Sequence, residues 1–162
     1  MTGESYTDRT DWWSAIDTLP PPRVAVIQDL EPDALGSAIG EVHAAILKAF
    51  GCEGVITNGA VRDIPGVSRM SFPMFARHPA VSHSYTHLVN YGEAVEVFGL
   101  KIRSGDLVMA DCHGAILIPL EIAEELSRVA AEIRVQERRI IDFCQSAEFS
   151  AEKLLELIQS TH

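Results

Sequence analysis

The sequence is poor in cysteine and in positive charge. Its three cysteines, Cys52, Cys112 and Cys144, are widely spaced and form no CxxC pair. This pattern argues against a disulfide framework or a structural zinc site and favours reduced thiols. Lysine and arginine number 13 against 23 aspartates and glutamates, which gives a formal net charge of −10. No basic stripe is therefore available to bind nucleic acid or an anionic membrane surface.

Long apolar runs are also missing. No stretch of 18 consecutive apolar residues is present, so the sequence predicts no transmembrane helix. The first residues, MTGESYTDRTDWW, lack the basic region and apolar core of a secretory signal. We therefore expect a cytoplasmic protein that binds neither nucleic acid nor membranes. With 162 residues, 47% of them hydrophobic and 22% charged, the chain has the size and composition of one soluble globular domain.

Hydrophobic periodicity in the first third of the chain alternates between helix and strand. The pattern predicts a helix over residues 7–18, a strand over 23–28, a second helix over 37–50 and a strand over 54–57. A strand–helix–strand order of this kind predicts two parallel strands joined by a right-handed crossover. The expected fold class is therefore α/β.

The later part of the chain changes from strands to helices. Short β-like runs separated by glycine, proline and aspartate are expected at 72–76, 85–90, 94–98, 107–110 and 115–118. Helical periodicity follows over residues 120–144. A shorter amphipathic helix is expected over 150–158, where a serine provides the N-cap.

The run GCEGVITNGAVRD at residues 51–63 is the first candidate for a functional site. It combines a short buried strand, an Asn58-Gly59 turn and the adjacent charges of Arg62 and Asp63. In α/β proteins, functional groups gather where strands end at the carboxyl edge of the sheet. The two charges also fit a surface ion pair worth roughly 0–1 kcal/mol. Alternatively, the carboxylate holds a metal ion and the guanidinium holds an anionic substrate.

The run GSAIGEVH at residues 36–43 is the second candidate, because it lies at the entrance of a predicted helix. The unpaired N–H groups and the positive dipole end of a helix favour an anion there. Glu41, in the first turn, either complements the helix dipole or acts as a base or water-orienting carboxylate beside a bound acid.

The histidines carry weaker signals. His83 and His87 are four residues apart, a spacing that chelates zinc on a helix. Their surroundings, residues 82–90, have a β-like composition that would hold the two rings apart, so we expect exposed or hydrogen-bonded histidines. His113 is expected in a hairpin turn between two apolar strands. A nucleophile pair of His113 with Cys112 is the alternative, against which stands the fact that adjacent side chains rarely point at each other.

Four segments in consistent order resemble the RraA-like family, which contains the 4-hydroxy-4-methyl-2-oxoglutarate aldolases and the regulators of ribonuclease E activity. They are Gly40-Glu41, GCEGVITNGAVRD at 51–63, FPMFAR at 72–77 and GLKIRSGDLVMADCHGAILIP at 99–119. The likeness runs from about residue 23 to residue 126. It implies a three-layer β/β/α sandwich of the swivelling type, assembled as a homotrimer or hexamer. One domain, 1–162, would then have its core at 23–126 and C-terminal helices within 120–160.

The resemblance also implies a set of site residues. Four positions match those that bind the substrate carboxylate and position a water in the aldolase branch: Gly40, Glu41, Val42 and His43. Arg62 matches the arginine that binds the pyruvate end of the substrate and stabilises its enolate. Asp63 matches the aspartate that anchors a divalent metal ion, Mg²⁺ or Mn²⁺, mostly through water.

The resemblance implies a metal-dependent aldolase that releases pyruvate from a small 2-oxo acid, with oxaloacetate decarboxylation as a second activity. Glu41 and Arg62 would be its catalytic residues. The alternative is a non-catalytic regulator of ribonuclease activity that binds proteins through an acidic trimer surface. The regulator branch typically lacks the aspartate found here at Asp63, which favours the enzyme. A third alternative is an inactive fragment.

The sequence departs from the family at three places. Asn58 stands where the family usually has aspartate, and Gly66 where it commonly has glutamate or aspartate. The family usually has more sheet before the strand at 23–28, so we expect a divergent or N-terminally truncated member. The family's site also borrows an acid from the C-terminal part of a neighbouring subunit, for which the candidates are Glu121, Glu124 and Glu125.

Overall fold

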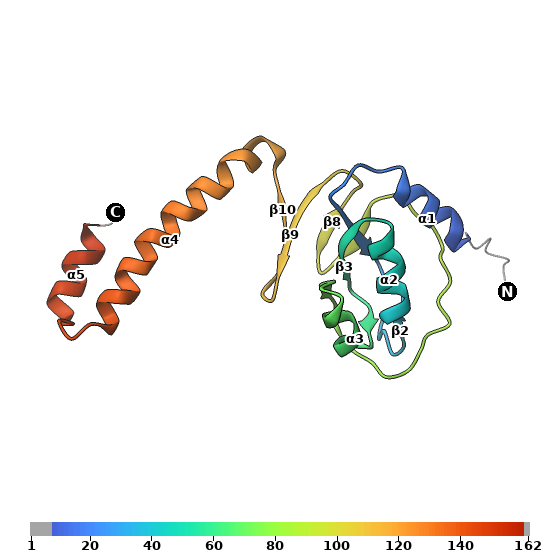
Figure 1. The fold of residues 1–162 in the computed structure, drawn as a ribbon, viewed down its shortest axis with the longest axis horizontal. Coiled ribbons are helices and arrows are strands. Elements are labelled where there is room, and N and C mark those ends of the chain that lie inside the picture. Colours follow the sequence, from blue (N-terminus) through green and yellow to red (C-terminus); the bar gives the residue numbers. More distant parts are fainter. Residues whose placement is uncertain (1–7, 161–162) are drawn as a thin grey trace. The chain divides into compact units, whose positions relative to one another are not determined.

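The computed structural model describes residues 8–160 (Figure 1). The chain divides into two compact units, Met1–Leu117 and Ile118–His162. The first unit contains nearly all of the strands, and the second consists mainly of helices. The prediction of one domain over 1–162 stays a prediction.

A parallel sheet forms the centre of the first unit. It consists of β1 (Arg23–Ile27), β3 (Cys52–Thr57) and β5 (Met74–Phe75), in the order β1-β3-β5. The predicted parallel pair is therefore confirmed. Five of the six residues of β3 are buried, as expected for a central strand covered on both faces. Helix α2 (Glu41–Ala49) covers one face of this sheet with its buried alanine and leucine side chains (Figure 1).

A second parallel sheet has the order β2-β4-β6 and lies next to the start of α2. Its strands are β2 (Ser37–Ile39), β4 (Ala60–Val61) and β6 (His78–Pro79). The helix predicted over 37–50 is therefore wrong in its first turn, because 37–39 form a strand. Pairing with β4, a contact between distant residues, overrides the local helical pattern here. The hydroxyl of Ser37, which is 1% exposed, also donates to the carbonyl of Ile39 at 2.8 Å.

Two further strand pairs follow along the chain, and the last residue of the second pair belongs to the second unit. The antiparallel pair consists of β7 (Val95–Val97) and β8 (Leu100–Ile102). The other pair consists of β9 (Leu107–Asp111) and β10 (Gly114–Ile118). The runs predicted over 94–98, 107–110 and 115–118 are thus confirmed as strands.

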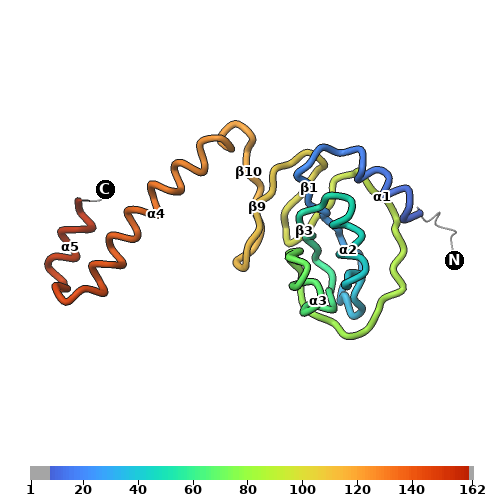
Figure 2. The backbone as a smooth tube through the Cα atoms, viewed as in Figure 1, coloured from blue at the N-terminus to red at the C-terminus, as the bar shows by residue number. Residues whose placement is uncertain are grey.

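The strand predicted over 85–90 is wrong. Figure 2 shows residues 80–94, in yellow-green, as a long loop, and the bridge between Ser37 and His83 ties it to β2. A strand needs a neighbour for its backbone groups, and the carbonyl of Thr86 instead accepts from the guanidinium of Arg9. His83 is exposed, and its ring nitrogen contacts the carbonyl of Ser84.

Two shorter helices belong to the first unit. Helix α1 (Arg9–Asp17) has Asp8 as its N-cap, whose carboxylate accepts from the backbone N–H of Thr10 at 2.8 Å. This helix confirms the one predicted over 7–18, of which residue 7 lies outside the described part. Helix α3 (Ile64–Arg69) follows β4 after two residues. The core that these elements enclose includes Ile39, Leu47, Val55, Val61 and Val67.

The second unit contains η1 (Leu120–Ile122), α4 (Ala123–Gln145) and α5 (Ala151–Gln159). These elements confirm the helices predicted over 120–144 and 150–158. The hydroxyl of Ser150 caps α5 by accepting from the backbone N–H of Lys153 at 3.3 Å. Among residues 8–160, no helix has both the length and the apolar character needed to cross a membrane.

Candidate functional site

The structure brings the two candidate segments together where β4 ends and α2 begins. The backbone N–H of Arg62 donates to the carbonyl of Ile39 at 2.9 Å, which extends the pairing of β4 with β2. One carboxylate oxygen of Asp63, Oδ2, accepts from the backbone N–H of Glu41 at 3.1 Å. The same oxygen lies 3.4 Å from Nε of Arg62. The sheet pairing thus places an acid at the start of α2 beside a neighbouring cation.

Two backbone features allow this close approach. Asp63 adopts φ 57° and ψ 30°, the left-handed conformation, which aspartate tolerates better than most residues. Gly40 lies directly over the pair of charges. A Cβ atom at Gly40 would stand 2.6 Å from Oδ2 of Asp63 and 2.7 Å from Nε of Arg62. Glycine is therefore required for the Arg62–Asp63 pair to stay in its present position.

The carboxylate of Glu41 lies over Gly66 on α3. A Cβ atom at Gly66 would stand 2.5 Å from both Cδ and Oε2 of Glu41. The space that a side chain at position 66 would occupy is therefore filled by the Glu41 carboxylate. The sequence marked Gly66 as a departure from the family, but it did not reveal this contact. The sequence predicted no helix over these residues, so it offered no signal for this contact.

Val42 and His43 do not join the cluster with their side chains. Val42 is 75% exposed. The His43 ring lies edge-on to Trp12 and Trp13, with ring centroids at 6.1 and 6.3 Å, and its Nδ1 lies 3.1 Å from the carbonyl of Ala38. Burial lowers the pKa of His43, so the neutral ring is favoured. The His43 side chain, which belongs to α2, thus packs against α1. Its backbone N–H, and not its ring, is the group that His43 places at the start of the helix.

A pocket of about 410 Å³ opens beside the Arg62–Asp63 pair. Besides these two residues, it is lined by Ile64, Pro65, Pro79, Ala80 and Val81. Nε of Arg62 is buried without a hydrogen-bond partner, because its contact with Asp63 lacks hydrogen-bond geometry. A pocket with apolar walls, one guanidinium and one carboxylate has the size and polarity of a site for a small anionic acid.

Asn58 has a structural partner that explains its departure from the family. Its side-chain oxygen accepts from the backbone N–H of Asp29 at 2.7 Å, and its side-chain nitrogen donates to the Asp29 carbonyl at 2.9 Å. An aspartate at this position has no N–H group for the second bond. Asn58 therefore ties the end of β3 to the loop after β1.

The comparisons with known proteins agree with these motifs. A family model described as "RraA-like: Aldolase/RraA" matches residues 1–117. A protein of Halalkalibacterium halodurans named "Putative 4-hydroxy-4-methyl-2-oxoglutarate aldolase" is 26% identical over 139 residues, which cover 83% of this chain and 66% of that protein. An uncharacterized protein of Methanocaldococcus jannaschii is 32% identical over 96 residues, covering 57% of this chain and 45% of the relative. The chain thus spans no more than about two thirds of either relative.

Solved structures show the same fold. An uncharacterized protein from Pseudomonas syringae pv. tomato matches with a TM-score of 0.70 at 24% identity, covering 96% of this chain and 71% of that protein. Streptomyces coelicolor RraAS2 is described as an unusual member of the RNase ES inhibitor RraA protein family. It matches with a TM-score of 0.62 at 24% identity, covering 78% of this chain and 65% of that protein. The predicted RraA-like α/β fold is therefore confirmed. Together with the family model over residues 1–117, these matches show that the chain belongs to the RraA-like family.

Proposed function

We propose that the protein is a divalent-metal-dependent carbon–carbon lyase. Its substrates would be acids of the 4-hydroxy-4-methyl-2-oxoglutarate type, cleaved to pyruvate, and oxaloacetate would be decarboxylated in the same pocket. The observation that carries this proposal is the contact of Asp63 with both Arg62 and the start of α2 beside an open pocket. The name of the Halalkalibacterium relative points to the same chemistry.

Asp63 suits a hard divalent cation. Both of its contacts use Oδ2, so a cation can approach Oδ1, and the side chain is 44% exposed, which leaves room for water ligands. Mg²⁺ and Mn²⁺ prefer oxygen ligands, and Mg²⁺ usually keeps several waters while binding one or two carboxylates. When bound, such an ion supplies Lewis-acid polarisation of the 2-oxo group of the substrate.

Arg62 binds and stabilises the pyruvate end of the substrate. Its side chain is 31% exposed, so the guanidinium lies in a partly desolvated position. Cleavage moves negative charge onto the oxygen of the departing pyruvate enolate. A guanidinium placed in advance beside that oxygen stabilises the transition state by several kcal/mol in typical cases, roughly 3–4 for one such donor.

Glu41 removes the proton from the 4-hydroxyl group, directly or through one water. The C3–C4 bond then breaks, its electron pair enters the enolate, and a carbonyl forms at C4. Protonation of C3 completes pyruvate. Oxaloacetate has no 4-hydroxyl group. Its C3–C4 bond breaks with C4 leaving as carbon dioxide, and the electron pair enters the same enolate. Decarboxylation therefore needs Asp63 and Arg62 but does not need Glu41 as a base.

This difference gives a direct test by coupled pyruvate release with both substrates, in Mg²⁺ or Mn²⁺ and in EDTA. Asp63→Asn keeps a residue that tolerates the left-handed conformation while removing the charge, and it should abolish both activities. Glu41→Gln should lower aldol cleavage by about 10²-fold or more and leave decarboxylation near wild type. Asp33→Asn, an exposed acid in the loop before β2, is the matched control.

Failure of the wild-type protein to release pyruvate from either substrate with metal present would contradict the proposal. So would full activity of Asp63→Asn. The non-catalytic regulator would then be the better assignment. We also propose the homotrimer or hexamer, whose mass by light scattering should be three or six times 17.7 kDa.

A further inference from the structure

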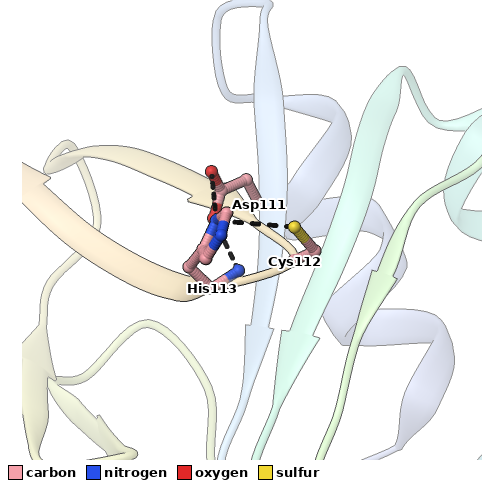
Figure 3. A group of neighbouring side chains, drawn as sticks. All are labelled: Asp111, Cys112 and His113. Carbon is pink, nitrogen blue, oxygen red and sulfur yellow. Dashed lines mark hydrogen bonds and ion pairs between the residues drawn. The ribbon is translucent and has the colours of Figure 1, made fainter. Parts of the chain in front are cut away.

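We propose that the turn between β9 and β10 binds a divalent transition-metal ion of the zinc class through Asp111, Cys112 and His113. The proposed function does not use these residues. Figure 3 shows the three side chains gathered at the tip of the hairpin, with the imidazole between the carboxylate and the thiol. Within residues 8–160 they form the one group of three such side chains whose ligand atoms all lie within 4.8 Å of one another.

The spacing of the ligand atoms fits a tetrahedral ion. Nδ1 of His113 lies 3.3 Å from Oδ2 of Asp111 and 3.4 Å from Sγ of Cys112. Zinc bonds of about 2.0–2.3 Å to nitrogen, oxygen and sulfur at tetrahedral angles place neighbouring ligand atoms roughly 3.3–3.6 Å apart. Nδ1 of His113 therefore stands at ligand spacing from each of the other two atoms, and all three lie within 4.8 Å of one another. All three residues are exposed, so water can reach the site as a further ligand.

The hairpin holds the carboxylate in place before any ion binds. Oδ1 of Asp111 accepts from the backbone N–H of His113 at 2.7 Å, which leaves Oδ2 to face the imidazole. The same bond is the main cause that lowers the pKa of Asp111. Gly114 follows at φ 145°, in a region that side chains rarely adopt. Because the ligands are consecutive residues, binding orders no distant segment.

The donor atoms distinguish this site from the one proposed at Asp63. A thiolate and an imidazole favour zinc, cobalt or copper, whereas carboxylate and water favour magnesium or manganese. On binding, Cys112 gives up its thiol proton and ligates as the thiolate, and His113 ligates through an unprotonated Nδ1. The thiol would consequently become less reactive when the ion is bound.

Cobalt(II) is the probe for the experiment, because a thiolate bound to cobalt gives a charge-transfer band in the near ultraviolet. The full-length protein, kept reduced, should show this band at one ion per chain, and zinc should abolish it while magnesium does not. Cys112→Ser should remove the band, and His113→Ala should weaken binding at least about tenfold. Cys144→Ser, a second exposed cysteine, and Asp63→Asn should both retain it.

Alkylation followed by mass spectrometry gives an independent readout. Zinc should slow the labelling of Cys112 at least about tenfold, since the bound thiolate is shielded, and should leave the labelling of Cys144 unchanged. Absence of the thiolate band, or its persistence in Cys112→Ser, overturns the inference. A third outcome also overturns the inference: cobalt binds without giving the thiolate band, and this binding is lost in Asp63→Asn. That outcome would leave the proposed lyase site intact.

Discussion

Replacing Gly66 with alanine should separate activity from stability. The new methyl carbon would lie 2.5 Å from Cδ of Glu41, and the three nearest heavy atoms all belong to the Glu41 carboxylate. Ordinary contact requires about 3.4–4 Å between such atoms, so the carboxylate must move by roughly 1 Å. Glu41 is exposed and can turn toward solvent. The substitution therefore moves the proposed base without disturbing the core.

The two expected effects have opposite signs. Gly66 lies within α3 and has no positive φ, so alanine should stabilise the fold by up to about 1 kcal/mol through the unfolded chain. For a chain of this length that corresponds to a rise in Tm of roughly 2–4 °C. A base displaced by about 1 Å should lower aldol cleavage about 10²-fold, which is roughly 2.7 kcal/mol of transition-state stabilisation.

Pyruvate release and urea unfolding measure these effects on the same samples. Oxaloacetate decarboxylation serves as the internal control, because it should be unchanged in Gly66→Ala. The double variant with Glu41→Gln should be no slower than Glu41→Gln alone, since both substitutions act through one carboxylate. Retention of aldol activity within about threefold of wild type would refute this reasoning, and so would losses that multiply in the double variant.

Three further outcomes are expected. Gly40→Ala places a carbon 2.6 Å from the carboxylate and 2.7 Å from the guanidinium of the adjacent ion pair, so the Mn²⁺ concentration needed for half-maximal activity should rise about tenfold or more. Burial lowers the pKa of His43, so as the pH falls the His43 ring takes up its proton in the unfolded chain before it does so in the folded protein. The contribution of His43 to stability is full above about pH 6.5 and falls below it by at most about 1.4 kcal/mol per pH unit, a slope that His43→Gln should lack in urea titrations. Burial raises the pKa of Cys52, which is 4% exposed, so a thiol reagent should label the two exposed cysteines in the native protein and Cys52 only after unfolding.

The sequence was informative wherever a local pattern decided the structure. The apolar run that forms β3 was readable because five of its six residues are buried. The runs that form β1 and α4 were readable from the spacing of their apolar residues, although α4 has no buried residue. The approach of residues 40–41 to residues 62–63 followed from the resemblance of their motifs to a family. No property of either segment alone predicts that contact.

The errors lie where distant partners decide. Residues 37–39 have a helical pattern but form β2, since β4 supplies backbone partners from over twenty residues away. Residues 85–90 have a strand composition but lie in a loop, because no named strand pairs with them along their length. The contact between Glu41 and Gly66 depends on the packing of α2 against α3, which neither helix specifies by itself.

The bonds of Asn58 have a consequence for the chemical ageing of the protein. An asparagine followed by glycine is prone to deamidation, in which the glycine backbone nitrogen attacks the side-chain amide. Here the amide is bonded on both sides to Asp29, and the N–H of Gly59 donates to the hydroxyl of Thr57 at 3.0 Å. Both reacting groups are thus held in place in the folded protein. Deamidation at this turn, followed by peptide mapping, should therefore be slow in the native state and fast after unfolding, and its product would include the aspartate that is usual in the family.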